Sequence, residues 1–160
     1  MHKLIPILGL LSLSGMAAAE PASEQVPTGY ALPHIQHENF GIVKIVVPLT
    51  SAEPAVLAFK LANINNAIEG VKASGGSVQA EMVLYGASPK LLVQPDSGLR
   101  SSIDRLRAAG VRFKVCNNSL KALDLNWRAL YQMQETDVVP SGFLEVGWRA
   151  NQGWAVEAMN

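Results

Sequence analysis

The single cysteine, Cys116, is the side chain with the most reactive chemistry in this 160-residue sequence. It ends a strand expected over residues 111–116. Asn117, Asn118 and Ser119 follow it, and these residue types favour the start of a helix. Unpaired amides and the helix dipole lower the pKa of a thiol at such a position, and the thiolate is the nucleophile. The pattern indicates a reactive thiol; the alternative is a small buried residue that only packs.

Two cations could strengthen this effect. Arg112 and Lys114 alternate with Cys116 along the expected strand. Alternate residues of a strand point to one face, so the two positive charges could lie on the same side as the sulfur. In that arrangement they would favour the thiolate further.

Motifs for other chemistries are absent from the sequence. It contains no Gly-x-Gly-x-x-Gly, no Walker loop, no Cys-x-x-Cys and no Gly-x-Ser-x-Gly. His34 and His37 lie three residues apart, but no cluster of Cys, His or carboxylate residues accompanies them. We therefore expect no metal site and no other cofactor.

Strands and helices alternate along the chain from residue 41. Apolar runs and period-two alternation predict five strands, and helical spacing with caps and glycine stops predicts four helices. The expected strands cover residues 41–49, 78–85, 111–116, 137–142 and 154–159, and the expected helices cover residues 55–72, 99–109, 119–131 and 143–152. This order predicts one α/β domain with a parallel sheet, helices on both faces and the last strand at an edge.

Candidate site residues follow from this order. Ligands bind open α/β sheets beyond the carboxyl ends of the strands. Cys116 lies at such an end and is the candidate catalytic residue. The candidate ligand-binding residues at these ends are Thr50, Ser51, Gly86, Asn117, Asn118, Ser119, Ser141 and Gly142.

The first residues have the pattern of a secretory signal peptide. Lys3 gives a positive start, residues 4–16 are apolar and uncharged, and small residues precede a cleavage site after Ala19. We expect a signal peptide over residues 1–19, an extended leader over residues 20–39 and the domain over residues 40–160. Such a protein is periplasmic or secreted, with no membrane contact after cleavage. Its single cysteine cannot form an internal disulfide, so the thiol is buried, bridged to another chain or kept for its reactivity.

Charge and composition limit the partners. The chain has 13 basic and 13 acidic residues and no basic run, which argues against nucleic acid. Hydrophobic residues make up 49% and charged residues only 16%. This balance indicates a large buried area, in a buried parallel sheet or at subunit interfaces.

Four stretches together carry a resemblance to a known family: residues 63–66, 83–86, 110–120 and 138–142, the last followed by Gly153 and Trp154. In this order along the chain they resemble segments of the DsrE/DsrF-like proteins, and most closely of their exported single-domain branch, which is related to the YchN-like proteins. The likeness covers roughly residues 41–159. It implies a three-layer α/β/α fold with a five-stranded, mainly parallel sheet, and homo-oligomers such as trimers or hexamers.

The resemblance also implies a role near sulfur transfer. In the sulfur-relay members a cysteine at this position carries a persulfide, and the matching residue is Cys116. Those members work in the cytoplasm beside partner subunits, whereas this chain has an expected signal peptide. The resemblance therefore leaves open which protein would donate the sulfur and which would accept it.

Three functions remain as hypotheses. The first is a sulfur carrier, or sulfurtransferase-like protein, that uses Cys116 as its persulfide carrier. The second is a non-catalytic oligomeric module that binds a small molecule or a protein near Gly86, Cys116 and Gly142. The third is a structural oligomer whose subunits are joined through tryptophans; the alternative for these aromatic residues is ordinary core packing. The tryptophans are Trp127, Trp148 and Trp154.

Overall fold

The computed structural model of this chain describes residues 29–31 and 39–158. The expected signal peptide, and most of the expected leader with His34 and His37, lie outside the described residues. Within the described part of the chain, no helix is both long enough and apolar enough to cross a membrane.

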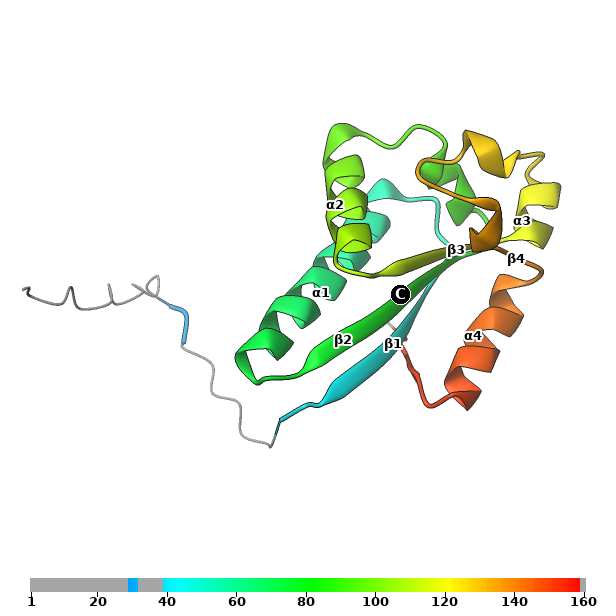
Figure 1. Cartoon of the computed structure of the whole chain (residues 1–160). Coiled ribbons are helices and arrows are strands. Elements are labelled where there is room, and N and C mark those ends of the chain that lie inside the picture. The colour runs from blue at the N-terminus through cyan, green and yellow to red at the C-terminus, as the bar shows by residue number, and fades with distance from the viewer. Residues whose placement is uncertain (1–28, 32–38, 159–160) are drawn as a thin grey trace, which may run out of the picture. The chain divides into compact units, whose positions relative to one another are not determined.

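Five parallel strands form one sheet in the order β4-β3-β2-β1-β5 (Figure 1). β1 and β2 pair along eight residues each, and each edge strand contributes two. Because every pair is parallel, all the carboxyl ends lie at one edge of the sheet. The bounds are β1 Ile42–Leu49, β2 Ser77–Leu84, β3 Arg112–Cys116, β4 Val138–Val139 and β5 Ala155–Val156.

Helices cover both faces of this sheet. Figure 1 shows α1 (Pro54–Ala73) and α2 (Ser97–Ala108) on one side and α4 (Gly142–Asn151) on the other. The shorter elements are α3 Asn117–Ala122 and the 3₁₀ turns η1 Ser88–Leu92, η2 Trp127–Ala129 and η3 Glu135–Asp137. This architecture confirms the predicted three-layer α/β/α fold with a five-stranded parallel sheet.

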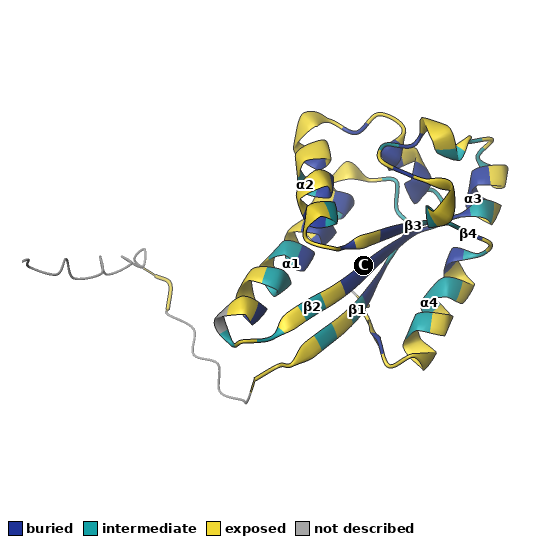
Figure 2. Ribbon diagram, in the orientation of Figure 1, coloured by how far each residue is buried: buried dark blue, intermediate teal, exposed yellow. Residues whose placement is uncertain are grey.

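The face under α1 and α2 carries the main hydrophobic core. Alternate residues of the three central strands point into it, as a period of two requires. In Figure 2, β1 and β2 become buried toward their carboxyl ends, which places the core close to the end of the sheet where all five strands finish. The core includes Val47 and Leu49 of β1, Met82 and Leu84 of β2, Phe113 and Val115 of β3, Leu57 and Leu61 of α1, and Ile103 and Leu106 of α2.

The opposite face, under α4, has a polar centre. Glu81 is completely buried, and its carboxylate accepts hydrogen bonds from Arg112 Nε at 3.0 Å and from Arg149 Nε and Nη2 at 2.8 and 2.6 Å. Both guanidinium groups also lie about 5 Å from the ring of Trp154 (5.1 and 5.0 Å). An ion-pair network and a small apolar cluster therefore hold α4 on the sheet. The buried residues of that cluster are Val46, Val83 and Trp154.

The helix predicted over residues 119–131 is wrong. α3 begins earlier and ends at Ala122, and the chain then turns at Asp124, which has a φ of 52°. Leu120 and Leu130 still enter the core, because the chain returns to it after the turn. The apolar spacing thus predicted correctly that Leu120 and Leu130 are buried, but the residues do not belong to one continuous helix.

The last two strands are also shorter than predicted. Only Val138 and Val139 pair with β3, and Pro140 follows them without an N–H group to donate. Only Ala155 and Val156 pair with β1, at the sheet edge where the last strand was expected.

Candidate functional site

Cys116 is the last residue of β3 and directly precedes α3. Its backbone is extended, with φ −75° and ψ 118°, and Asn117 is the first helical residue. Phe113 and Val115 point into the main core, so Cys116 points to the α4 side of the sheet. The residue is 5% exposed, which makes it a nearly enclosed thiol at the carboxyl edge of the strands.

Four groups that can donate a hydrogen bond lie close enough to the Cys116 sulfur to favour its thiolate. They are the hydroxyl of Ser119 and the backbone amides of Gly142, Ser119 and Asn118. Burial raises the pKa of the Cys116 thiol, but these donors stabilise the thiolate more strongly and hold the pKa below its ordinary value of 9.0. The largest of the stabilising effects comes from the Ser119 hydroxyl.

Gly86 fixes the direction of the Ser119 hydroxyl. The Gly86 amide donates to Ser119 Oγ at 2.8 Å, so the oxygen is already an acceptor and its own hydrogen can point to the sulfur. Gly86 has a φ of +62°, a conformation that other residues rarely adopt. The turn after β2 therefore places the Gly86 amide where it orients the Ser119 side chain, which belongs to α3 after β3.

Gly142 brings the start of α4 against the thiol. A Cβ at this position would lie 3.2 Å from Cys116 Cβ and 2.8 Å from Tyr85 Cβ. Only glycine allows the start of α4 to pack this closely against Cys116 and Tyr85. Ser141 caps the helix, because its Oγ accepts a hydrogen bond from the amide of Leu144 at 3.4 Å.

Arg112 and Lys114 lie on the same face of β3 as Cys116, but their charged groups bind other partners than the sulfur. Lys114 Nζ donates to the carbonyl of Thr136 at 2.8 Å and lies 3.7 Å from a carboxylate oxygen of Asp137. Arg112 pairs with Glu81 under α4. Neither cation is among the groups that shift the Cys116 pKa, so hydrogen bonding alone stabilises the thiolate.

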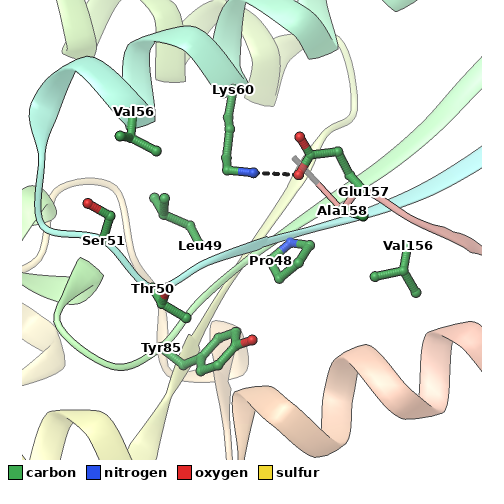
Figure 3. A pocket seen from close by; sticks show the side chains of 10 residues that line it. All are labelled: Pro48, Leu49, Thr50, Ser51, Val56, Lys60, Tyr85, Val156, Glu157 and Ala158. Carbon is green, nitrogen blue, oxygen red and sulfur yellow. Dashed lines mark hydrogen bonds and ion pairs between the residues drawn. The ribbon is translucent and has the colours of Figure 1, made fainter. Parts of the chain in front are cut away.

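A pocket of about 410 Å³ opens at the carboxyl end of β1 (Figure 3). Thr50 and Ser51 line it, and the ammonium of Lys60 on α1 forms an ion pair with Glu157 beyond β5. Tyr85 belongs to both regions, since it lines the pocket while its Cβ and Cδ1 lie next to Gly142. The other lining residues are Pro48, Leu49, Val56, Val156 and Ala158.

The predicted site residues fall into three groups. Ser119, Asn118 and Gly142 gather at the Cys116 sulfur, and Gly86 is linked to it through the Ser119 hydroxyl. Ser141 lies beside them as the cap of α4. Thr50 and Ser51 line the pocket at the end of β1, which Tyr85 also lines. Asn117 lines a separate hollow of about 410 Å³, together with Trp127 and Pro140 among others.

Sequence reasoning missed Tyr85, Lys60 and Glu157. Tyr85 directly follows β2, so its place at a carboxyl strand end was a usable signal. Lys60 and Glu157 are 97 residues apart, and no local pattern links them. As for metals, the described residues contain no group of three or more His, Cys, Asp or Glu that could hold an ion.

Comparisons with known proteins bear on the fold. No family model matches this chain, and neither does any curated protein. Among solved structures, the chain is similar to MTH1491 from Methanobacterium thermoautotrophicum, which is described as a protein of unknown function. The two share 26% sequence identity with a TM-score of 0.61, over 72% of this chain and 97% of that chain. The likeness thus supports the α/β fold, and it assigns no activity.

Proposed function

We propose that this protein is an exported, DsrE-like sulfur carrier in which Cys116 holds a sulfur atom as a persulfide. The observation that carries the proposal is the convergence of four hydrogen-bond donors on the sulfur of the single cysteine. The resemblance of residues 110–120 to the DsrE/DsrF-like proteins supports the same role. The signal-like start of the sequence supports a periplasmic or secreted location.

Sulfur transfer to Cys116 needs no outside oxidant. The Cys116 thiolate attacks the terminal sulfur of a donor persulfide, R–S–SH. A new S–S bond forms as the donor S–S bond breaks, the donor leaves as R–S⁻, and the proton stays on the transferred sulfur. An acceptor thiolate then attacks that outer sulfur, which makes the acceptor a persulfide and returns Cys116 to the thiolate.

The donors around the sulfur assist both steps. A lowered pKa increases the fraction of thiolate that can attack the donor. In the second step Cys116 is the leaving group, and a thiol of lower pKa leaves faster. The same amides and the Ser119 hydroxyl thus serve uptake and release of sulfur.

The burial of Cys116 restricts which donors can reach it. The residue is only 5% exposed, and the start of α4 packs against it through Gly142. We therefore expect small inorganic polysulfides and low-molecular-weight persulfides to react faster than a bulky thiol reagent. An acceptor protein would need to present its thiol on a flexible segment.

Intact-mass spectrometry after treatment with polysulfide tests this function. The wild-type protein should gain about 32 Da, one sulfur atom, and the Cys116→Ser variant should gain nothing. A relocated thiol gives a matched control, because Ser101 is exposed on α2. In the double variant Cys116→Ser/Ser101→Cys, uptake at pH 7 should be slower than in the wild type. Absence of the adduct in the wild type, or equal rates for the two thiols, would contradict the proposal.

A second candidate function is the binding of a small polar molecule without thiol chemistry. It is favoured by the pocket at the end of β1, whose walls include the hydroxyls of Thr50, Ser51 and Tyr85 and the Lys60–Glu157 ion pair. A buried ion pair carries a desolvation cost, which is more easily understood if the pair also binds a ligand. Opposite charges on one wall suit a zwitterion.

Thermal denaturation with a panel of amino acids as zwitterionic probes tests the second candidate. A ligand should raise the melting temperature of the wild type and of Cys116→Ser equally, and Lys60→Met should abolish the shift. If no probe shifts the wild type, this reading loses its support.

A further inference from the structure

Helix α4 presents apolar side chains to solvent and charged side chains to the sheet. Phe143, Leu144 and Trp148 are 73%, 69% and 51% exposed. Arg149 instead turns inward, where it pairs with the buried Glu81, and it also pairs with Glu145 on the same helix. A surface helix normally places these residue types the other way round. The outer side of α4 is therefore suited to being covered.

Gly147 lies in the middle of this apolar side and has no evident role within the subunit. It does not have a positive φ, and a Cβ at this position would meet no atom within 4 Å. Glycine in a helix interior destabilises the helix relative to alanine. On an apolar helix face, however, the lack of a side chain lets a second helix approach closely. A glycine at position 147 is thus explained if a helix from outside the subunit packs against α4 at this residue.

Charge favours a second copy of the chain as the occupant. The exposed residues of α4 are all uncharged, so two such faces can meet without repulsion between like charges. If the helices cross antiparallel, the positive end of each helix dipole also lies near the negative end of the other. The exposed residues are Phe143, Leu144, Gly147, Trp148, Ala150 and Asn151.

The exposed apolar area of α4 also favours a second copy of the chain. Large aromatic side chains contribute roughly 150–250 Å² each, so the exposed parts of Phe143 and Trp148 amount to roughly 200–300 Å². A standard interface buries about 800 Å² per subunit, of which a little over half is apolar. With Leu144 added, the helix supplies a large part of the apolar area that a stable pair of subunits needs.

We propose that the α4 face, defined as Phe143, Leu144, Gly147 and Trp148, is a two-fold docking surface for a second copy of this chain. In an antiparallel crossing at Gly147, the two glycines lie against each other, and Leu144 and Trp148 of each copy pack on the partner helix, as an isologous interface requires. Such a contact gives dimers, or hexamers that contain two-fold axes. It cannot by itself give a trimer.

The α4 face begins next to the thiol site. Gly142, whose amide donates to the Cys116 sulfur, directly precedes Phe143. A second copy on the α4 face therefore covers the edge of the thiol site and narrows its opening to solvent. The docking surface itself does not depend on the sulfur-carrier function, since it rests on α4 alone.

Sedimentation velocity of the purified protein at micromolar concentration tests the docking surface. The wild type should sediment as an even multiple of the subunit mass. Leu144→Glu and Trp148→Glu should each weaken association on the order of 100-fold or more, because the interface contains each substitution twice. Phe59→Glu is the matched control, since Phe59 is 53% exposed on α1, and it should leave association unchanged. Circular dichroism would show that the variants remain folded.

Gly147→Ala tests the close crossing separately. Within the subunit the added methyl group meets open space and favours the helix, so the isolated subunit should be slightly more stable. Association should nevertheless weaken about tenfold if two helices cross at this residue. Unchanged association in Gly147→Ala would overturn the crossing at Gly147. A monomeric wild type, or an oligomer that both glutamate variants leave intact, would overturn the docking surface itself.

Discussion

On one side of the sheet, α1 and α2 close over a continuous apolar core in which Phe113 and Met82 are almost or completely buried. On the other side, α4 rests on the buried carboxylate of Glu81 and on two arginines, with only a small apolar cluster beside them. The thiol of Cys116 lies on this second side, at the start of α4. The same three central strands thus support two very different layers.

This difference separates stability from chemistry. An apolar core contributes most of the free energy of folding but offers no group that could hold an anion. The α4 side supplies directed amides and a hydroxyl to the sulfur, at the cost of a less apolar contact with the sheet. We therefore expect substitutions on the two sides to affect different measurements.

The largest expected effect on stability comes from the apolar side. Phe113→Ala removes a ring that is 1% exposed and should lower the free energy of unfolding by about 3–5 kcal/mol. The pH midpoint of Cys116 alkylation should stay the same in the population that remains folded. Urea denaturation measures the first quantity and a pH series of alkylation rates the second. A shifted midpoint would show that the two sides are not independent.

Gly142→Ala should be the most damaging small change on the α4 side. The added methyl group would lie 2.8 Å from Tyr85 Cβ, an atom fixed to the backbone, so α4 must move away. We expect a loss of about 1–3 kcal/mol in the free energy of unfolding. The alkylation midpoint should also rise, because the amide of residue 142 leaves the sulfur.

Gly70→Ala on α1 is the control for this change. A Cβ there meets nothing within 4 Å and the residue does not have a positive φ, so alanine should stabilise the helix slightly and leave the thiol unaffected. If the two glycine variants behave alike, the close packing at Gly142 is not what positions the amide.

Local patterns were sufficient to predict the order of the elements, because each long strand and helix carries its own periodicity. They failed after Cys116, where the apolar positions of Leu120 and Leu130 fit a helix that the chain does not form. The positive φ of Asp124 breaks that helix. Aspartate adopts this conformation only occasionally, so the residue type alone is a weak signal for a helix end. Burial was thus predictable there, and the backbone path was not.

The site was predictable to the extent that it follows from topology. Parallel strands end at one edge, which placed Gly86, Cys116 and Gly142 together before any contact was known. The hydrogen bond from Gly86 to Ser119 was not predictable, since it depends on the exact turn after β2. Nor was the pairing of Lys60 with Glu157, which requires β5 to lie beside β1.

Ser119→Ala tests the strongest of the interactions that stabilise the thiolate. The Cys116 pKa is lowered in the folded protein, so alkylation of the wild type should reach its midpoint below pH 9.0. Loss of the hydroxyl should move this midpoint upward and slow alkylation at pH 7 by up to about tenfold. The Gly86 amide also loses its acceptor, so the free energy of unfolding should fall by about 1–2 kcal/mol.

The control for Ser119→Ala is another buried serine. Ser88 donates to the carbonyls of Leu49 and Tyr85 at 2.6 and 2.9 Å and is completely buried. Ser88→Ala should cost a similar free energy of unfolding while the alkylation midpoint stays in place. Equal midpoints in the two serine variants would refute the role of the Ser119 hydroxyl.

The smallest expected effect comes from the charges under α4. Burial raises the pKa of Glu145 above 4.5, and the hydrogen bond and negative charge of Glu81 raise it further. The folded protein therefore binds this proton more tightly than the unfolded chain does. Between pH 4.5 and the raised pKa, this group makes the free energy of unfolding fall as pH rises, and the loss persists above that pKa.

Glu145→Gln should remove this pH-dependent loss. The variant should be more stable than the wild type at pH 7 by less than about 1 kcal/mol, because the ion pair with Arg149 is lost as well. The advantage should vanish below pH 4.5, where the wild-type carboxyl is protonated in both states. Urea denaturation at pH 4 and pH 7 measures it, with the exposed Glu69→Gln as control. If the variant were more stable than the wild type by the same amount at both pH values, the advantage would not come from ionisation of Glu145. The negative charge of Glu81 would then not destabilise the ionised Glu145 carboxylate in the folded protein.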